Sequence, residues 1–214
     1  MPTLEHRDRI FVTGETGEGK SLLVRTLFSA ARPPKVVVDP VGSAMTRVAG
    51  PTFRDPTRLP DAAECRFVPR DPTDLDAYEE LHRRLWVRLR AAVAKGDPQR
   101  WSLWEWVDEA GLVLPVSKTP ESARTMVITG RKWNIGGAWL HTRPREVSKA
   151  VLANAQHTVI FGLALAEDRD YVSDQCAIPR AELDRALSEL GGGGACLWWE
   201  RRARVLHPMT LEIT

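Results

Sequence analysis

The sequence predicts an α/β fold in which helices flank a mainly parallel central sheet and a β-hairpin closes the chain. Three observations lead to this prediction. Short apolar runs rich in β-branched residues alternate with segments of helical periodicity. A glycine-rich segment joins the first of these runs to the first helix. Two further extended runs, residues 195–200 and 202–207, follow a run of glycines and predict the hairpin.

The glycine-rich segment lies between a predicted strand, residues 9–13, and a predicted helix, residues 21–28. It reads GETGEGKS and fits the phosphate-binding pattern G-x-x-x-x-G-K-[ST]. Glycines let successive backbone N–H groups turn inward onto phosphate oxygens, and the following helix adds its unpaired N–H groups. Lys20 is predicted to reach the β- and γ-phosphates of ATP, and the Ser21 hydroxyl to bind Mg²⁺. The predicted nucleotide-binding residues are Gly14, Glu15, Thr16, Gly17, Glu18, Gly19, Lys20, Ser21 and Leu22.

A second predicted strand covers residues 35–40 and is ended by Asp39-Pro40, and a third covers residues 64–69. The stretch between them, residues 42–63, predicts a loop with one short helix. Apolar residues then recur at steps of three and four over residues 75–95, which predicts a long helix. Its charged positions predict a solvated face, with contact to DNA as the alternative: His82, Arg83, Arg84, Arg88 and Arg90.

Two adjacent carboxylates, Asp108 and Glu109, follow a mostly apolar predicted strand at residues 103–107 that only Glu105 interrupts. In parallel α/β sheets ligands bind at the carboxyl ends of the strands, so this pair and the phosphate-binding loop are expected at one edge. Asp108 is then predicted to hold the Mg²⁺ shell. Glu109 is predicted to orient and deprotonate the water that attacks the γ-phosphate.

The rest of the chain continues the alternation of strands and helices. Residues 111–115 and 130–136 predict a loop and a turn, because glycine and proline break the periodic patterns there. The remaining predicted elements are a helix at 120–131, a strand at 138–142, a helix at 146–155, a strand at 158–163, a helix or loop at 164–175 and a helix at 180–190.

Length and composition bound the alternatives. A chain of 214 residues with 43% hydrophobic and 27% charged residues suits one domain, residues 1–214, with a sizeable core. No apolar run approaches the roughly 20 residues that span a bilayer, and the polar N-terminus is unlike a signal peptide, so no membrane insertion is expected. Three cysteines without a C-x-x-C pair fit a reducing compartment and argue against a zinc site.

Four segments resemble motifs of the FtsK/HerA superfamily of DNA-pumping ATPases, within the RecA-like additional-strand P-loop NTPases. VVVDP at residues 36–40 resembles that family's second strand, and WVDEA at 106–110 resembles its Walker B strand. GRKWNIG at 130–136 resembles the Gly-Arg turn before its sensor strand. HTRPREV at 141–147 resembles its Thr-Gln-Arg-Pro sensor motif. Together with the Walker A loop, the resemblance covers residues 9–207.

The resemblance implies a ring, usually a hexamer, in which an arginine of the neighbouring subunit completes each active site. Arg124 and Arg131 are the first candidates for this arginine, and Arg143 is the third. A sensor is implied at the tip of the strand that ends near residue 142. The family has Gln where this chain has Thr142, and His141 is the alternative sensor.

We expect none of the extra domains of the cellular members, and the chain looks most like the small genome-packaging ATPases of membrane-containing icosahedral viruses. This resemblance implies sequence-independent translocation of double-stranded DNA into a preformed capsid from the host cytoplasm. Virion association and docking on a capsid vertex or membrane protein are left open. Loops at residues 47–58 or around Lys118 are expected to line the DNA channel. The alternatives are a conjugation, secretion or phage-export motor, and an ATP-binding switch or scaffold with little turnover.

Overall fold

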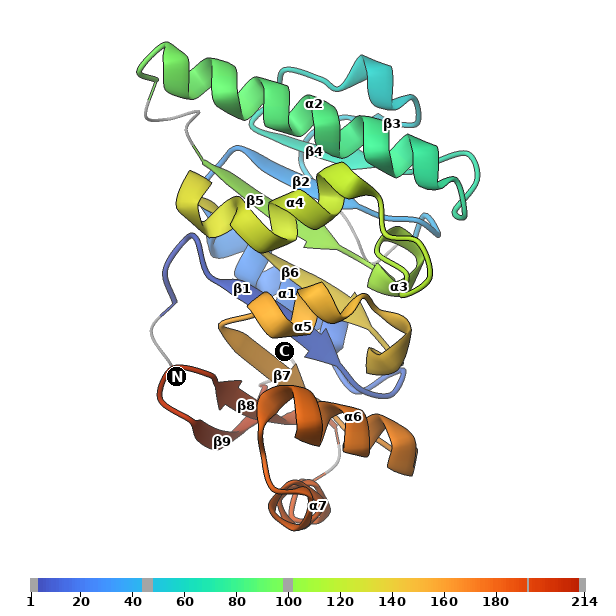
Figure 1. Ribbon diagram of the computed structural model, residues 1–214, viewed down its shortest axis with the longest axis vertical. Coiled ribbons are helices and arrows are strands. Elements are labelled where there is room, and N and C mark those ends of the chain that lie inside the picture. Colours follow the sequence, from blue (N-terminus) through green and yellow to red (C-terminus); the bar gives the residue numbers. More distant parts are fainter. Residues whose placement is uncertain (1–3, 44–47, 98–101, 192, 212–214) are drawn as a thin grey trace.

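A computed structural model describes residues 4–43, 48–97, 102–191 and 193–211 (Figure 1). Within these residues, nine strands form one sheet in the order β3-β4-β2-β5-β6-β1-β7-β8-β9. Neighbouring strands from β3 to β7 are parallel, and β8 and β9 are antiparallel to their neighbours. The predicted α/β class with a mainly parallel sheet and a closing hairpin is therefore confirmed. The strands are β1 (Arg9–Thr13), β2 (Lys35–Val38), β3 (Thr52–Phe53), β4 (Glu64–Phe67), β5 (Leu103–Val107), β6 (Ile135–His141), β7 (His157–Ile160), β8 (Ala195–Glu200) and β9 (Val205–Thr210).

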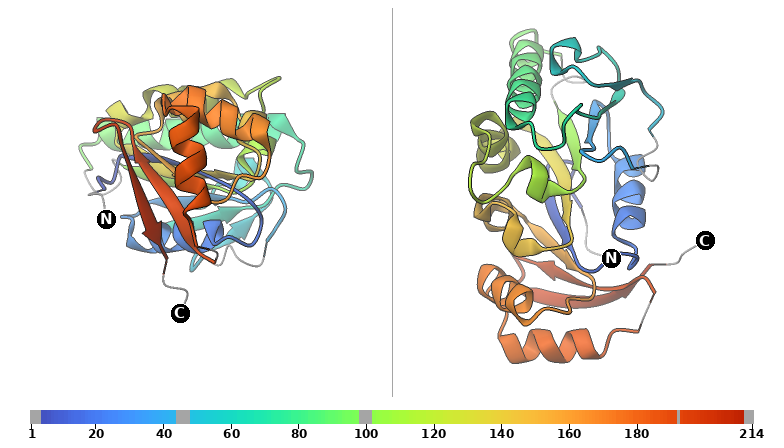
Figure 2. Two further views of the ribbon diagram at one scale, coloured as in Figure 1. Left: turned by 90° about the horizontal axis from the view of Figure 1, so that it is seen from below. Right: turned by 90° about the vertical axis from the view of Figure 1, so that its right-hand side faces the viewer.

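Helices cover both faces of the sheet. The right-hand view of Figure 2 shows α1 on one face and α2, α4, α5 and α6 on the other. The helices are α1 (Lys20–Ala30), α2 (Leu75–Ala94), α3 (Ala110–Val113), α4 (Glu121–Thr129), α5 (Lys149–Asn154), α6 (Ala166–Cys176) and α7 (Arg180–Ser188). Three short 3-10 turns join them: η1 (Pro56–Arg58), η2 (Gly130–Trp133) and η3 (Pro144–Glu146).

Strand β6 lies between the phosphate-loop strand β1 and the Asp-Glu strand β5. Its register pairs His141 with Thr13 of β1 and Trp139 with Val107 of β5. The carboxyl ends of the parallel strands therefore meet at one edge of the sheet, on the right in Figure 1. The loops that follow β1, β5 and β6 are brought together at this edge.

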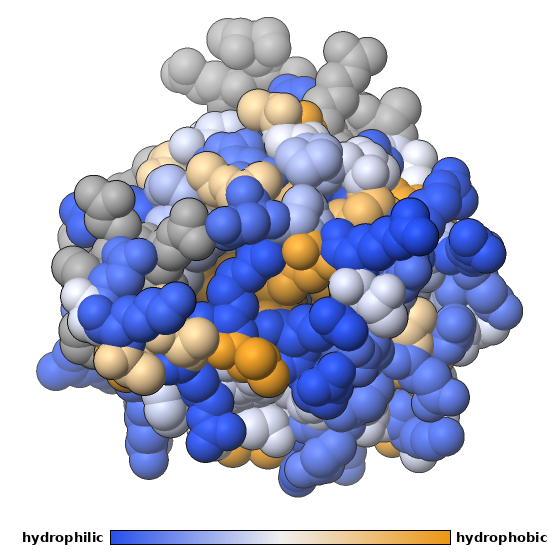
Figure 3. All heavy atoms as spheres, turned by 90° about the horizontal axis from the view of Figure 1, so that it is seen from above, coloured by the Kyte–Doolittle hydropathy of each residue, from blue (hydrophilic) through white to orange (hydrophobic). Residues whose placement is uncertain are grey.

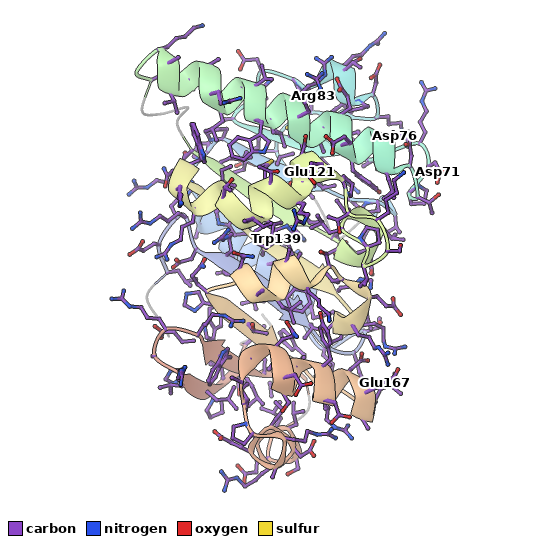
Figure 4. The ribbon with its side chains drawn as sticks, in the orientation of Figure 1. Asp71, Asp76, Arg83, Glu121, Trp139 and Glu167 are labelled. Carbon is purple, nitrogen blue, oxygen red and sulfur yellow. The ribbon has the colours of Figure 1, made fainter. Side chains whose placement is uncertain are left out.

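The apolar residues of the strands alternate between two cores. On one face, Leu23, Val24 and Phe28 of α1 pack on a core that includes Trp104 and Trp106. The Phe28 ring lies 5.8 Å from both tryptophan rings. On the other face, α2, α4 and α5 pack on β2, β4, β5 and β6, and Figure 4 shows Trp139 of β6 on this side, beneath α4. Because both faces are covered, the central strands are fully buried, which accounts for their continuous apolar runs.

Several predicted boundaries are wrong. Strand β6 begins at Ile135, inside the segment that predicts a turn. Two glycines suggest a turn there, but they belong to a tightly packed strand. A Cβ at Gly136 would lie 1.9 Å from the His6 carbonyl oxygen, and one at Gly137 would lie 2.3 Å from that of Glu105. Glycine is needed at this point for close backbone approach, so the residue type alone misleads.

Other differences concern short elements. The predicted loop at residues 111–115 contains α3, whose Ala110 and Val113 are fully buried and hold one helical turn in place. The predicted helix at 146–155 is η3 followed by α5, and the second hairpin strand is β9, at 205–210. Strand β3 and η1 lie in the stretch expected to hold only a loop and one short helix.

The charged face predicted for α2 needs one correction. His82 is 1% exposed and lies under the helix, where its ring contacts Glu105 of β5. Arg83 and Arg90 are exposed as expected, and Figure 3, viewed from the end of the molecule that carries α2, shows a mostly hydrophilic surface. His82 follows Tyr78 by four residues and precedes Leu85 by three, so helical periodicity places it on the buried face of α2 with them. No described helix combines the length and the apolar character that crossing a bilayer requires.

Candidate active site

The phosphate-binding loop connects β1 to α1 and depends on glycine at three positions. Gly14, Gly17 and Gly19 have φ angles of +136°, +89° and +103°, which L side chains rarely adopt. Gly14 is also confined, because a Cβ there would lie 2.6 Å from the Cβ of Phe161. The spacing of the glycines in the motif therefore follows from backbone geometry and from packing against the segment after β7.

Lys20, the first residue of α1, extends back over the loop. Its Nζ donates hydrogen bonds to the carbonyl oxygens of Gly14 at 2.7 Å and Glu15 at 2.6 Å. Burial lowers the pKa of Lys20, whereas the carboxylates of Glu109 and Asp108 act in the opposite direction. The lysine and the two acids thus share one electrostatic environment, although about ninety residues separate them in the sequence.

Asp108 directly follows β5, and its backbone N–H donates to the Val38 carbonyl of β2 at 2.9 Å. Burial, together with the nearby carboxylates of Asp39 and Glu109, raises the pKa of Asp108 to about 6. Crowding of this kind is relieved by a cation. No group of three or more His, Cys, Asp or Glu in the described residues could hold a metal. Asp108 and Ser21 fit Mg²⁺ in its usual mode, in which one protein carboxylate is combined with phosphates and water.

Glu109 has a backbone conformation that is uncommon for a residue other than glycine, with φ 47° and ψ 55°. Its Oε2 lies 3.0 Å from Nδ1 of His141, at the end of β6. Contact with His141 lowers the pKa of Glu109 against the effect of burial, and Lys20 lowers it further. Glu109 is consequently ionised at neutral pH, as a general base must be.

These residues line one cleft of about 370 Å³ at the carboxyl edge of the sheet. This volume lies within the range of small-molecule sites. The phosphate loop, the Asp108-Glu109 pair and the end of β6, with His141 and Thr142, all contribute to its lining. The lining residues are Thr16, Gly17, Gly19, Lys20, Ser21, Leu22, Val41, Ser43, Asp108, Glu109, Leu140, His141 and Thr142.

Sequence reasoning missed two contributors to this region. Glu146 in η3 contacts the far side of the His141 ring. Asp39, fully buried at the end of β2, accepts hydrogen bonds from the backbone N–H groups of Gly42 and Ser43 and pairs with Arg66 of β4. The sequence signal for Asp39 was its place at the end of a buried strand. The sequence signal for Glu146 is its place shortly after the Arg-Pro dipeptide. Neither signal predicts which side chain Asp39 or Glu146 contacts.

The three candidate arginines lie outside the cleft. Arg143 pairs with Asp168 at 2.7 Å and with Glu167 at 2.5 Å, so its contacts in this chain are to α6. Arg124 is exposed on α4. Arg131 is exposed in η2, which precedes β6 and therefore lies at the edge of the sheet opposite the cleft. The arrangement leaves Arg124 and Arg131 open to a neighbouring molecule and gives Arg143 an internal partner.

The loops predicted to line a DNA channel are residues 47–58 and the segment around Lys118. Arg47 lies outside the described residues. The rest of that loop contains β3 and η1, and η1 packs against α2. Arg54, Arg58 and Lys118 are all exposed.

No family model and no curated protein matches this sequence, but solved structures do. The genome-packaging NTPase B204 of Sulfolobus turreted icosahedral virus 2, in complex with AMPPCP, aligns with a TM-score of 0.79 and 13% identity over 98% of this chain and 100% of its own. The pCW3 conjugation coupling protein TcpA aligns with a TM-score of 0.61 and 14% identity over 96% of this chain and 60% of its own.

A third match is EccC of Thermomonospora curvata (ATPases 2 and 3), with a TM-score of 0.58 and 13% identity over 97% of this chain and 37% of its own. At these identities the likeness concerns the fold, and the B204 match extends over both chains almost completely. The chain therefore has the RecA-like P-loop fold that these solved structures share, and B204 shares it over its whole length.

Proposed function

We propose that this protein hydrolyses ATP and uses the energy to move double-stranded DNA into a preformed viral capsid. The observation that carries the proposal is the single cleft in which Lys20, Asp108, Glu109 and His141 meet. The fold supports it, because the structurally similar B204 is a genome-packaging NTPase that has been seen with AMP, AMPPCP and ATP-gammaS.

The chemistry follows from the positions of the side chains. Backbone N–H groups of the loop would hold the phosphates, and Lys20 would neutralise charge on the β- and γ-oxygens. Mg²⁺, held through Ser21 and Asp108, would supply further neutralisation. Glu109 lines the same cleft and would accept the proton of the attacking water. Thr142, at the end of β6, would sense the γ-phosphate, because both ring nitrogens of His141, the alternative sensor, already lie against Glu109 and Glu146.

Coupling to DNA is the next part of the proposal. A ring of subunits, with six as the expected number, would enclose the duplex and contact mainly its phosphates, so binding would be insensitive to sequence. Exposed Arg54, Arg58 and Lys118 are the candidates for this contact. A capsid vertex or membrane protein would be the docking partner, and the host cytoplasm the site of action.

DNA-dependent turnover tests this function. We expect duplex DNA of any sequence to raise the ATPase rate at least several-fold, and rising salt to reduce the stimulation because phosphate contacts are screened. The measurement is steady-state phosphate release with and without duplex DNA, with Lys20→Ala as the inactive control. Slow turnover that does not respond to DNA would instead favour the ATP-binding switch.

The likeness to TcpA and EccC keeps an export motor as the second candidate. Packaging in the presence of the cognate capsid separates the two motors.

Mixed rings test whether an arginine acts across subunits. Arg124→Ala or Arg131→Ala subunits are mixed with Glu109→Gln subunits, each inactive on its own. If the arginine acts in trans, some interfaces in the mixture combine an intact Glu109 with an intact arginine, and we expect part of the ATPase activity to return. Such an arginine contributes about 10³–10⁵ in rate where it has been defined. Mixtures that stay inactive at every ratio would exclude both residues. Arg143→Ala serves as the comparison, because its partners lie within its own chain.

A further inference from the structure

The side chain of His141 lies between two carboxylates. Its Nδ1 is 3.0 Å from Oε2 of Glu109, an ion-pair distance without hydrogen-bond geometry. Its Nε2 is hydrogen-bonded to Oε2 of Glu146 at 3.2 Å. The ring is only 9% exposed, whereas the Glu109 and Glu146 side chains are 39% and 56% exposed. A buried imidazole thus connects the carboxylate that faces the cleft to a second carboxylate in η3.

The ring is held tightly from the side of α3. A Cβ on Gly111 would lie 2.5 Å from Nε2 and 2.7 Å from Cε1 of His141, so the backbone of α3 rests directly on the imidazole. Glu109 immediately precedes α3 and adopts its left-handed backbone conformation at this junction. The same ring therefore contacts both the Glu109 carboxylate and the helix that fixes the Glu109 backbone.

The turn η3, which carries Glu146, is held against α6 by ion pairs. Glu146 belongs to η3, and Arg145 of the same turn pairs with Glu167. Arg143, just before η3, donates from Nε to Asp168 at 2.7 Å, and Asp168 is 2% exposed. Figure 4 shows Glu167 at the end of α6 that lies at the carboxyl edge of the sheet, where η3 is also found. The turn that carries Glu146 is consequently fixed in place.

We propose that His141 is a positioning residue for Glu109: it holds the carboxylate toward the cleft through Nδ1 and is itself oriented by Glu146 and seated on Gly111. The inference rests on the proposed function, in which Glu109 is the general base. Orientation of a catalytic group is worth a large factor in rate, since a displacement of about 1 Å can cost about a hundredfold. The nucleotide itself is held by the phosphate loop, so the effect belongs to turnover and not to binding.

Two amide substitutions distinguish the contribution of Nδ1 from that of Nε2. His141→Asn places an amide nitrogen near the position of Nδ1, and His141→Gln places one near that of Nε2. We expect His141→Asn to lose less of the turnover number than His141→Gln or His141→Ala. His141→Gln and His141→Ala should each lose about ten- to a hundredfold, with the Kd for ATP unchanged. Gly111→Ala should lose turnover in the same way, because the new Cβ displaces the ring.

The matched control is His157→Asn, which changes another buried histidine, one that contacts Asp8 and accepts a hydrogen bond from Trp198. Its turnover number should stay near the wild-type value under conditions where it is folded. Full activity of His141→Ala beside an inactive Glu109→Gln would overturn the role of His141 while leaving the proposed function intact. Equal losses in His141→Asn and His141→Gln would do the same. A wild-type protein without turnover would remove the proposed function and this role together.

Discussion

Glu109→Gln is expected to bind MgATP with nearly wild-type affinity and to hydrolyse it about 10²–10⁴ times more slowly, the usual contribution of a general base. The amide keeps the size and the position of the side chain but cannot take a proton from water. Lys20, the loop amides and Asp108 remain, so the phosphate-binding groups are unchanged. The measurement combines equilibrium binding of a fluorescent ATP analogue with single-turnover hydrolysis.

The control for this variant is Glu182→Gln, which makes the same chemical change at an exposed position on α7. It should turn over ATP at the wild-type rate. The pH profile adds a second check. Because contact with His141 lowers the pKa of Glu109, the base stays ionised as pH falls through the ordinary range of a glutamate. Normal turnover in Glu109→Gln would show that another group activates the water.

The parts of the site that the sequence predicts are those whose chemistry is local. The phosphate loop needs left-handed glycines at fixed spacing, and Lys20 follows directly from the pattern. Asp108 and Glu109 were placed at the same edge because parallel strands share the direction of their carboxyl ends. Each of these steps uses either a short motif or a general property of α/β sheets, and the structure brings the residues together accordingly.

The contacts that the sequence did not predict depend on register. His141 reaches Glu109 because β6 pairs His141 with Thr13 and ends beside the start of α3. No local sequence pattern predicts how β6 pairs with β1. The glycines at the start of β6 even argued for a turn, since the backbone that approaches them comes from distant parts of the chain. Long-range packing therefore decides where sequence patterns remain ambiguous.

The same limit applies to a buried pair of charged residues whose contact no sequence pattern predicts. His82 of α2 and Glu105 of β5 are 1% exposed each, and His82 Nε2 lies 2.8 Å from Glu105 Oε1. His82 Nδ1 lies 2.6 Å from the Tyr78 carbonyl oxygen. In the sequence, His82 falls among arginines and Glu105 interrupts an apolar strand. Because His82 and Glu105 contact each other, both polar side chains can be buried between α2 and the sheet.

His82→Leu is expected to lower the free energy of unfolding by about 3–5 kcal/mol near pH 6, because it leaves the Glu105 carboxylate buried without a partner. The double variant His82→Leu, Glu105→Met should recover most of this loss, since neither charge then remains. Urea denaturation followed by circular dichroism measures both. The control is Arg83→Leu, one position along α2 and exposed, which should change stability by no more than about 0.5 kcal/mol.

The contribution of this pair should also depend on pH in a defined direction. Burial lowers the pKa of His82, but the nearby carboxylate of Glu105 and the Tyr78 carbonyl outweigh burial, and the net effect raises it. A histidine whose pKa is higher in the folded state stabilises fully below its unfolded value of about 6.5, and this contribution disappears as pH rises through the folded pKa. The stability advantage of the wild type over the double variant should therefore shrink between pH 6 and pH 9. If the stability difference between the wild type and the double variant stays constant or widens as pH rises, His82 is neutral throughout this pH range. If His82→Leu alone is as stable as the double variant, Glu105 finds another partner.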